Sequence, residues 1–447
     1  MRDRFLWVGC TLYAILFAAL GALKYAVHRN LVDFGIFAQT SASAFGCFCN
    51  PIEGSHWAYH FSPILYLAGA AVKLSGSPLA LVAVQAAAGA LVAPPVYALA
   101  RARAGIGVAR LTAVVVWLYP PLAGLIFGDF HENGFAPAAV AWTLYAFDAG
   151  SIAGTFAGAA VTLAIKEDQA VFLALAGALG AWRWRGTTRG RVAGAVALAS
   201  AALLGAYVFA IRPHASAPAA GWEPLRFYAW SASDARALIG TLPARLGFVA
   251  LAFVPLLFLP FGTAAIAPAI APLGEVLFSR MSTTYTMGTH YAGAWIGYVV
   301  VAFAVSVRRL QPSRAPLLLR ICIALCVLEL ALADPLHPGL NLRAPQPRDA
   351  ALDAFLRRLP PGADVATQEE AYTHLALRDP RARLLPERSD RPLDACFVLL
   401  DADFPASARV AEYGAAFASQ VSAGEYVLVS RAGAISLYRR AADCSRS

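Results

Sequence analysis

Runs of about 20 apolar residues recur along this chain, and they restrict its fold more than any other feature. The first run is FLWVGCTLYAILFAALGALKYAV, and each run is long enough to cross a lipid bilayer. Of the 447 residues, 59% are hydrophobic and 14% are charged, whereas soluble domains carry about a quarter charged residues. The sequence therefore predicts an α-helical polytopic membrane protein. The first run follows MRDR, but it is longer than the apolar part of a signal peptide, and no small-residue cleavage site follows. We expect a retained helix.

The basic residues are almost all arginine, and they lie in loops that flank the apolar runs. The positive-inside rule explains the net charge of +9, so no nucleic-acid partner is expected. The arginine-dense short loops all fall on one side of the predicted topology, the cytoplasmic side: 101–110, 183–191 and 308–314. An outer loop at about 212–244 also carries arginines, namely Arg212, Arg226 and Arg236. Either this loop is long enough to escape the rule or its arginines bind something.

Hydropathy and arginine bias together predict about eleven transmembrane segments in the inner (plasma) membrane of a bacterium. The N-terminus is expected in the cytoplasm. The predicted segments are, in order, 5–26, 79–100, 108–127, a hairpin of two short segments (135–148 and 152–165), a helix after KEDQ, 192–211, a hairpin at 246–279 turning at LPFGT, a helix before VRRLQPSR, and 315–333.

The composition changes near residue 345, where apolar runs give way to mixed sequence. The stretch ALDAFLRRLPPGADVATQEEAYTHLALRDP indicates a helix, a Pro-Gly break, a short strand and another helix. ACFVLLDADF and EYVLVSRAGAISLYRR indicate buried and paired strands, the latter turning at RAG. We therefore expect a transmembrane domain over 1–344 and a small extracytoplasmic α/β domain over 345–447.

Polar residues gather in four loops that the topology places on the outer side. They are Asp33, Gln39, His56 and His60 in the first loop, Asp129, His131 and Glu132 in the second, Lys166, Glu167 and Asp168 in the third, and His290 and Tyr291 in the last. Ionisable groups at membrane depth cost several kcal/mol unless they face water or each other. Such a cluster therefore indicates a functional site.

Each loop also has a simpler interpretation. Asp33 would cap a helix, and the two loop-one histidines, four residues apart, would share a helix face without binding a metal. DFHENG would be a polar turn, KED a favourable helix start, and His290-Tyr291 an interfacial anchor. All of these would have to hold at four separate loops, which favours the joint functional interpretation.

Seven cysteines show no metal-ligand spacing, and Cys47 and Cys49 form a C-x-C. A disulfide so close in sequence would be strained, so the sequence favours two free thiols, although an extracytoplasmic loop would permit a bridge.

A carboxylate at the outer membrane surface can deprotonate a hydroxyl acceptor, while a nearby cation holds a leaving phosphate. A glycosyl transfer from a lipid-linked donor needs both roles.

Several segments together resemble one bacterial membrane family, DUF2079, which is grouped by similarity with the GT-C glycosyltransferases. They are DFGIFAQ, HFSPILYLAGAAVKLSGSPLALVAVQA, YPPLAGLIFGDFHENGFAP, IKEDQA, the HY after a polar loop, and THLALRDPRARLLPE with His374, Leu375 and Arg378. The resemblance covers nearly the whole chain.

The resemblance implies a GT-C-like transmembrane core, a polyprenyl-phosphate sugar donor and an acidic base in the first outer loop, which corresponds to Asp33. Asp129 and Glu132 become further catalytic acids, and His60 and His131 join them in contacting an acceptor. The donor phosphate is assigned to basic residues: Lys166, Arg212, Arg226 and Arg280. Further substrate contacts are assigned to Glu167, His290 and Tyr291. A divalent ion, Mg or Mn, is a candidate cofactor with Asp129, His131 and His60 as ligands. GT-C members show two adjacent acids in the first loop, whereas Phe34 follows Asp33 here, which argues against a metal at Asp33.

The first hypothesis is therefore a membrane glycosyltransferase whose partners are membrane lipid and a lipid-linked sugar. The alternatives are a transporter or lipid flippase and a non-catalytic lipid-binding scaffold. Against the transporter, the charges cluster at one face and the second half does not repeat the first.

Overall fold

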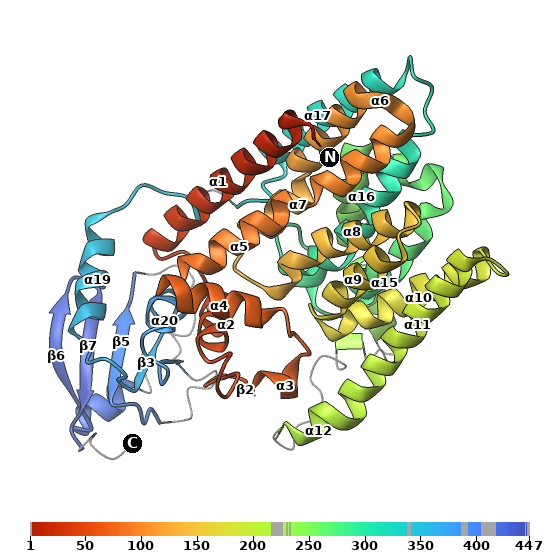
Figure 1. Cartoon of the computed structure of the whole chain (residues 1–447). Helices are drawn as coiled ribbons and strands as arrows, with labels where there is room; N and C mark the ends of the chain where they lie inside the picture. Colours follow the sequence, from red (N-terminus) through yellow and green to blue (C-terminus); the bar gives the residue numbers. More distant parts are fainter. Residues whose placement is uncertain are drawn as a thin grey trace. The chain divides into compact units, whose positions relative to one another are not determined.

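The computed structural model (Figure 1) describes residues 2–215, 227–228, 231, 234–337, 341–385, 392–403, 417–442 and 444. The chain folds as two compact units. Unit 1 comprises 1–19, 57–65 and 82–337, and unit 2 comprises 20–56, 66–81 and 338–447. The domain boundary between residues 344 and 345 stays a prediction.

Unit 1 is helical. Its α-helices are α6 (Ala93–Leu118), α7 (Pro120–Phe127), α8 (Ala136–Asp148), α9 (Ile152–Leu163), α10 (Glu167–Arg183), α11 (Thr188–Ala206), α12 (Arg212–His214), α13 (Ala235–Gly240), α14 (Leu242–Phe253), α15 (Ile270–Phe278), α16 (Gly293–Val307) and α17 (Ala315–Leu332). Four helices contribute residues to both units: α1 (Arg4–Ala26), α3 (His56–Tyr59), α4 (Leu65–Ser75) and α5 (Leu79–Ala90).

Five helical stretches in the described part of the chain are long and apolar enough to cross a membrane. They are Arg4–Ala26, Leu79–Leu118, Thr188–His214, His290–Val307 and Ala315–Leu332. Several of them expose large apolar side chains, such as Leu198 (74%), Phe209 (82%) and Leu332 (75%). An exposed apolar surface of this kind suits lipid and not water.

Helix α16 is the most enclosed of these helices, and every residue from Gly293 to Val307 is buried. Glycine permits its close packing on α8, because a Cβ at Gly297 would lie 2.7 Å from Cβ of Val140. Trp295 meets the rings of Tyr119 and Phe248 edge to face, at centroid distances of 6.4 and 5.7 Å. This buried helix is the core of unit 1.

Three predicted features differ in detail. The predicted helix at 108–127 is divided at Tyr119, where α6 ends and α7 begins. The loop at 101–110 is helical, and α6 continues through it with a break at Gly105, where φ is 80°. The hairpin at 246–279 is not two plain helices, because 3₁₀ turns separate α14 from α15: Val254–Leu256, Leu259–Gly262 and Ala264–Ala269. Pro255, Pro260 and Pro268 explain the turns, since proline lacks the N–H that a continuous helix needs.

Besides most of α4, unit 2 contains α2 (Val32–Ala42), α19 (Pro347–Arg358), α20 (Glu369–Leu375), a small hairpin of β1 (Cys49–Asn50) and β2 (Gly54–Ser55), and a five-stranded sheet. The sheet strands are β3 (Val365–Thr367), β4 (Arg383–Leu384), β5 (Phe397–Asp401), β6 (Tyr426–Ala432) and β7 (Ile435–Arg440). Their order is β4-β3-β5-β7-β6, with β3 parallel to β4 and β5, and β7 antiparallel to β5 and β6. The predicted helices and strands of the tail are confirmed, and β4 is additional. The β6–β7 hairpin turns at Gly433, whose φ of 58° suits a tight turn.

Helix α2 packs on α20 within unit 2. A Cβ at Gly35 would collide with the Tyr372 ring, so only glycine allows this approach. The Tyr372 hydroxyl donates to Oε1 of Gln39 at 2.5 Å, and the Gln39 amide donates to the carbonyl of Ala382 at 3.0 Å. These bonds fix the helix that carries Asp33.

Cys47 and Cys49 are joined in a disulfide, so the prediction of two free thiols is wrong. Phe48 between them has left-handed backbone (φ 49°), which turns the chain sharply enough to bring the Cα atoms within 5.2 Å.

Candidate functional site

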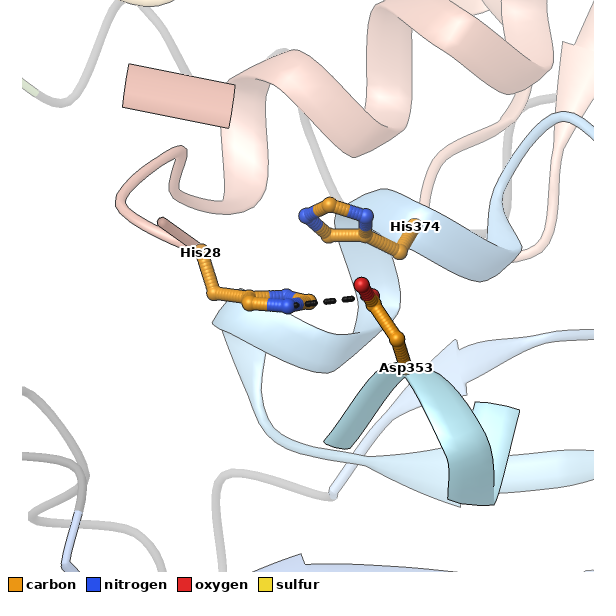
Figure 2. Close-up of side chains that lie close together, drawn as sticks. All are labelled: His28, Asp353 and His374. Atoms are coloured by element: carbon orange, nitrogen blue, oxygen red, sulfur yellow. Dashed lines mark ion pairs between the residues drawn. The ribbon is translucent and has the colours of Figure 1, made fainter. Parts of the chain in front are cut away.

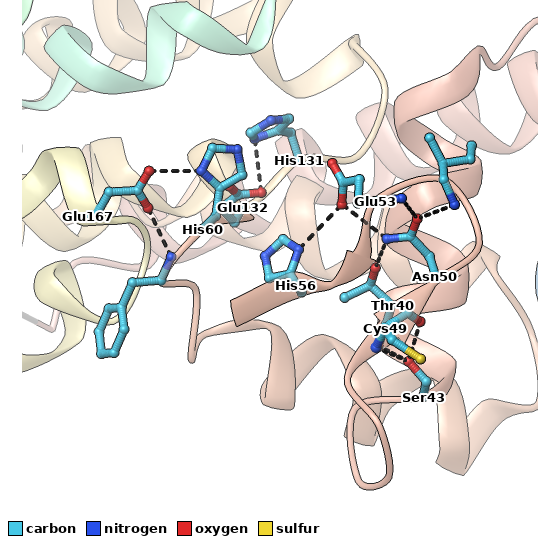
Figure 3. A network of polar contacts seen from close by, with 12 residues as sticks. Thr40, Ser43, Cys49, Asn50, Glu53, His56, His60, His131, Glu132 and Glu167 are labelled. Atoms are coloured by element: carbon cyan, nitrogen blue, oxygen red, sulfur yellow. Dashed lines mark hydrogen bonds and ion pairs between the residues drawn. The ribbon is translucent and has the colours of Figure 1, made fainter. Parts of the chain in front are cut away.

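The first turn of α10 holds the segment that carries His60. Glu167 accepts from Nδ1 of His60 at 2.8 Å and from the backbone N–H of Phe61 at 2.9 Å (Figure 3). The N–H of Ile64 also donates to the carbonyl of Ala164 at 2.7 Å. Glu167 therefore fixes the orientation of the His60 ring.

Burial and charge compete at this pair. Burial raises the pKa of Glu167, but His60, Lys166 and the Phe61 N–H outweigh it and bring that pKa to about 2. Burial likewise lowers the pKa of His60, and the Glu167 carboxylate outweighs it, so this pKa lies above its ordinary value. At neutral pH the carboxylate is ionised.

Lys166 and Asp168 flank Glu167. Burial opposes the charge of Lys166, but Asp168, Glu132 and Glu167 outweigh burial and raise its pKa above the ordinary value. Burial, partly offset by Lys166, raises the pKa of Asp168 to about 6. The cluster thus contains a stable cation beside a carboxyl that titrates near neutrality.

The second predicted loop is held from α5. The backbone N–H of His131 donates to Oε1 of Gln85 at 3.0 Å, and the Gln85 amide donates to the carbonyl of Ile126 at 3.2 Å. Nδ1 of His131 lies 3.2 Å from the N–H of Asn133 and 3.1 Å from Oε2 of Glu132 (Figure 3). One nitrogen cannot accept from Asn133 and donate to Glu132 at once. Nδ1 of His131 is therefore an acceptor for Asn133 or a donor to Glu132.

The last predicted loop meets the second. The rings of His131 and His290 stack at a centroid distance of 3.8 Å, and His290 lies 4.0 Å from Tyr291. Glu132 is fully buried, and its negative charge contributes to raising the pKa values of His60, Lys166 and Asp168. The structure therefore brings together residues from all four predicted loops.

Other predicted residues lie elsewhere in unit 1. Asp129 is half-buried in the same loop as His131. Arg212 is the first residue of α12. It lies close enough to the Tyr207 hydroxyl to interact with it electrostatically, as Glu167 and Lys166 also do. Arg280 pairs with Asp234 at 3.5 Å and is 45% exposed. Arg226 lies outside the described residues.

Asp33 and His56 belong to unit 2. Asp33 lies half-buried in the first turn of α2. Nδ1 of His56 is 3.6 Å from Glu53. The expectation that His56 and His60 share a helix face is wrong, because α3 ends at Tyr59. His60 turns instead to Glu167.

Sequence reasoning missed three residues of the cluster. The Tyr228 side chain forms a hydrogen bond with Glu275. The Glu275 carboxyl also interacts electrostatically with Asp168, Lys166 and Glu167. Glu275 is the one acid in the apolar stretch AIAPLGEVLF, and an acid in such a stretch is itself a signal. Gln85 is likewise the one polar residue in the apolar sequence of α5, and this isolation could have identified it.

Only one group of three potential metal ligands lies within binding distance in the described part of the chain, and it is His28, Asp353 and His374. Asp129, His131 and His60 are not such a group. Their metal role stays a prediction.

The family described as "Predicted membrane protein (DUF2079)" matches residues 29–430. Among solved structures, ArnT from Cupriavidus metallidurans bound to undecaprenyl phosphate superposes with a TM-score of 0.57 and 12% identity, covering 98% of both chains. ArnT in the apo state gives 0.54 and 13%, covering 96% of this chain and 98% of that chain. A search of the curated proteins found no match. At these identities, the similarity shows that the chain shares its fold with ArnT.

Proposed function

Because the chain belongs to the DUF2079 family of membrane proteins and has the fold of ArnT, we propose that it is a GT-C-type glycosyltransferase. It transfers a sugar from a polyprenyl-phosphate donor to an acceptor outside the cytoplasm, in the inner membrane of a bacterium. The neighbouring structure of ArnT bound to undecaprenyl phosphate supports a donor of this class.

The polar cluster of unit 1 carries the proposal. It places the Lys166 cation beside the ionised Glu167 and beside Glu132, which pairs with His131. A membrane protein keeps buried charges where they act on a substrate or on each other. The cluster thus supplies the cation that a leaving phosphate requires, with carboxylates beside it.

In the proposed step, the acceptor hydroxyl attacks the anomeric carbon of the sugar. The bond from this carbon to the phosphate oxygen breaks, and the polyprenyl phosphate leaves with the electron pair. A carboxylate takes the hydroxyl proton as general base, the role that the family resemblance assigns to Asp33. Lys166, Arg212, Arg226 and Arg280 hold the leaving phosphate, since fixed cations stabilise charge as it develops.

The remaining cluster residues bind and orient the acceptor. Glu167 fixes Nδ1 of His60, so His60 acts through Nε2. Glu132 and Asp129 are the second-loop acids, and His131, His290 and Tyr291 flank them. No step is assigned to a metal ion here, because the described residues of this cluster do not gather three ligand atoms.

The test is sugar transfer from undecaprenyl-phosphate-linked sugars in membranes that contain Asp33→Asn, Glu132→Gln or the control His337→Gln. His337 is in an exposed pair with Asp334. We expect each acid variant to lose at least about 100-fold in rate, since a general base contributes 10²–10⁴-fold. Undecaprenyl phosphate should still stabilise both variants against heat, which would show that they are folded. Normal transfer by both acid variants would refute the proposal.

A further inference from the structure

Two histidines and an aspartate meet in unit 2, away from the residues discussed above. His28 follows the end of α1, Asp353 lies on α19, and His374 lies on α20. Figure 2 shows the His374 ring over the His28 ring, with the Asp353 carboxylate directed toward both. They come from three separate segments, and 346 positions (374 − 28) separate the two histidines.

One ligand atom from each residue lies within 4.8 Å of the other two. Nε2 of His28 is 3.2 Å from Oδ1 of Asp353, and the imidazole centroids are 4.0 Å apart. Ligands of a tetrahedral zinc ion at about 2.0–2.1 Å stand roughly 3.3 Å from one another. The aspartate and His28 already have this spacing, and the His374 ring, which lies over that of His28, would turn its nitrogen toward the ion.

Burial disfavours a positive charge on both imidazoles. Burial lowers the pKa of His28, against the opposing charges of Asp353 and Asp349, and Arg343 lowers it further. Burial and the neighbouring His28 lower the pKa of His374 well below its ordinary value. The Arg343 charge is offset by its own pair with Asp349, at 2.7 Å.

The supporting contacts resemble those around metal-bound histidines, whose second ring nitrogen usually bonds a backbone carbonyl or carboxylate. The backbone of Tyr25 hydrogen-bonds His374, and the Tyr25 ring stacks on it at 4.0 Å. Nε2 of His374 is buried without a hydrogen-bond partner in the described part of the chain. A buried polar atom in this state costs free energy that a bound cation would remove.

The backbone at His28 supports the same interpretation. Its φ is 55°, a left-handed conformation that is uncommon for non-glycine residues, among which histidine adopts it more often than most. Such outliers cluster where a side chain has to be aimed at a site.

We propose that His28, Asp353 and His374 bind a divalent cation of the zinc class. Two imidazoles and one carboxylate suit zinc better than magnesium or calcium, which prefer oxygen ligands. Three protein ligands leave a fourth position for water. The ion would join the end of α1 to α19 and α20 within unit 2.

The experiment uses the full chain in detergent, stripped with a chelator and titrated with zinc alone. Wild type, Asp353→Asn, His374→Gln and the control His337→Gln are compared. We expect wild type and the control to bind one more zinc equivalent than the other two variants. Loss of one ligand should weaken zinc binding at this site at least about 10-fold, since even outer-shell changes cost 10–100-fold.

Zinc should also raise the melting temperature of wild type and His337→Gln and not that of the two site variants. Cobalt in place of zinc should give a visible spectrum that Asp353→Asn loses. Asp353 is 42% exposed, so its variant should fold even if His374→Gln does not. Equal zinc content in wild type and Asp353→Asn, or no bound zinc in wild type, would overturn the proposal.

Discussion

Adjacent carboxyl groups in unit 1 behave in opposite ways at the residue scale. Glu167 accepts two hydrogen bonds, one of them from His60, and its pKa is brought to about 2 from an ordinary value of 4.5. Asp168 has an ordinary value of 3.8 and is raised to about 6 by burial. The folded protein thus stabilises the ionised form of Glu167 and destabilises the ionised form of Asp168.

The signs of the pH dependence follow from linkage. Glu167 stabilises the fold above about pH 4.5, and this contribution is lost as the pH falls toward about 2. His60, whose pKa is raised, stabilises it below about pH 6.5 and less as the pH rises through the raised value. Asp168 lowers stability as the pH rises from about 3.8 through about 6.

Glu167→Gln should therefore destabilise the protein by about 3 kcal/mol near pH 6, at 1.36 kcal/mol for each unit of pKa shift. The measurement is unfolding in detergent at several pH values, and the loss should shrink toward pH 3. The matched control is Asp168→Asn, whose neutral side chain removes a charge that burial opposes. At pH 8 it should not be destabilising. A larger loss for Asp168→Asn than for Glu167→Gln would contradict this account of the pair.

At the scale of elements, the loop between α7 and α8 depends on two glycines and one glutamine. A Cβ at Gly134 would lie 2.8 Å from Oε1 of Gln85, and a Cβ at Gly293 would collide with the carbonyl of Asn133. Helix α16 can start beside this loop only because residue 293 lacks a side chain. The same packing brings His290 onto His131.

Gly293→Ala should cost roughly 1–3 kcal/mol of stability, the usual penalty of overpacking, and should reduce the proposed sugar transfer by displacing His131. Thermal unfolding and the transfer assay measure the two effects. Gly205→Ala is the control, because a Cβ there meets nothing within 4 Å. It should leave stability unchanged or raise it by up to about 1 kcal/mol. Equal stability of the two variants would show that the loop tolerates the displacement.

Much of this element pattern could be predicted, because apolar periodicity and length determine where helices form. The predicted positions of α1, α8, α9 and α17 differ from the observed ones by few residues. The 3₁₀ turns around Pro255 and Pro260 were not predicted, since proline spacing does not give the conformation between two helices. The loops of the site were predicted from topology alone. Contacts such as Gln85 with His131, or His28 with His374, depend on tertiary packing that no local pattern encodes.

At the scale of the molecule, helices of unit 1 carry opposite kinds of polar residues at their two ends. Helix α10 starts at Glu167 of the polar cluster, and 3₁₀ turns that begin at Glu132 and His290 lead directly into α8 and α16. At the other end of α8, Asp148 accepts from Arg308 at 2.6 Å and, through its carbonyl, from Arg189 at 2.9 Å. Two arginine-dense loops therefore converge on one helix end, as the positive-inside rule expects for the cytoplasmic side.

This segregation predicts the orientation of the chain. In a Cys444→Ser background, the remaining free cysteines are buried and Cys47 and Cys49 are bridged. A single exposed cysteine is then added at Ser282→Cys, in the segment before His290, or at Thr188→Cys, in an arginine-dense loop. A membrane-impermeant maleimide applied to spheroplasts should label Ser282→Cys at once and Thr188→Cys only after permeabilisation. The reverse pattern would invert the proposed orientation and place the polar cluster in the cytoplasm. Labelling of both from one side would mean that the helices between these positions do not separate them across the bilayer, and the extracytoplasmic transfer reaction would then lose its structural basis.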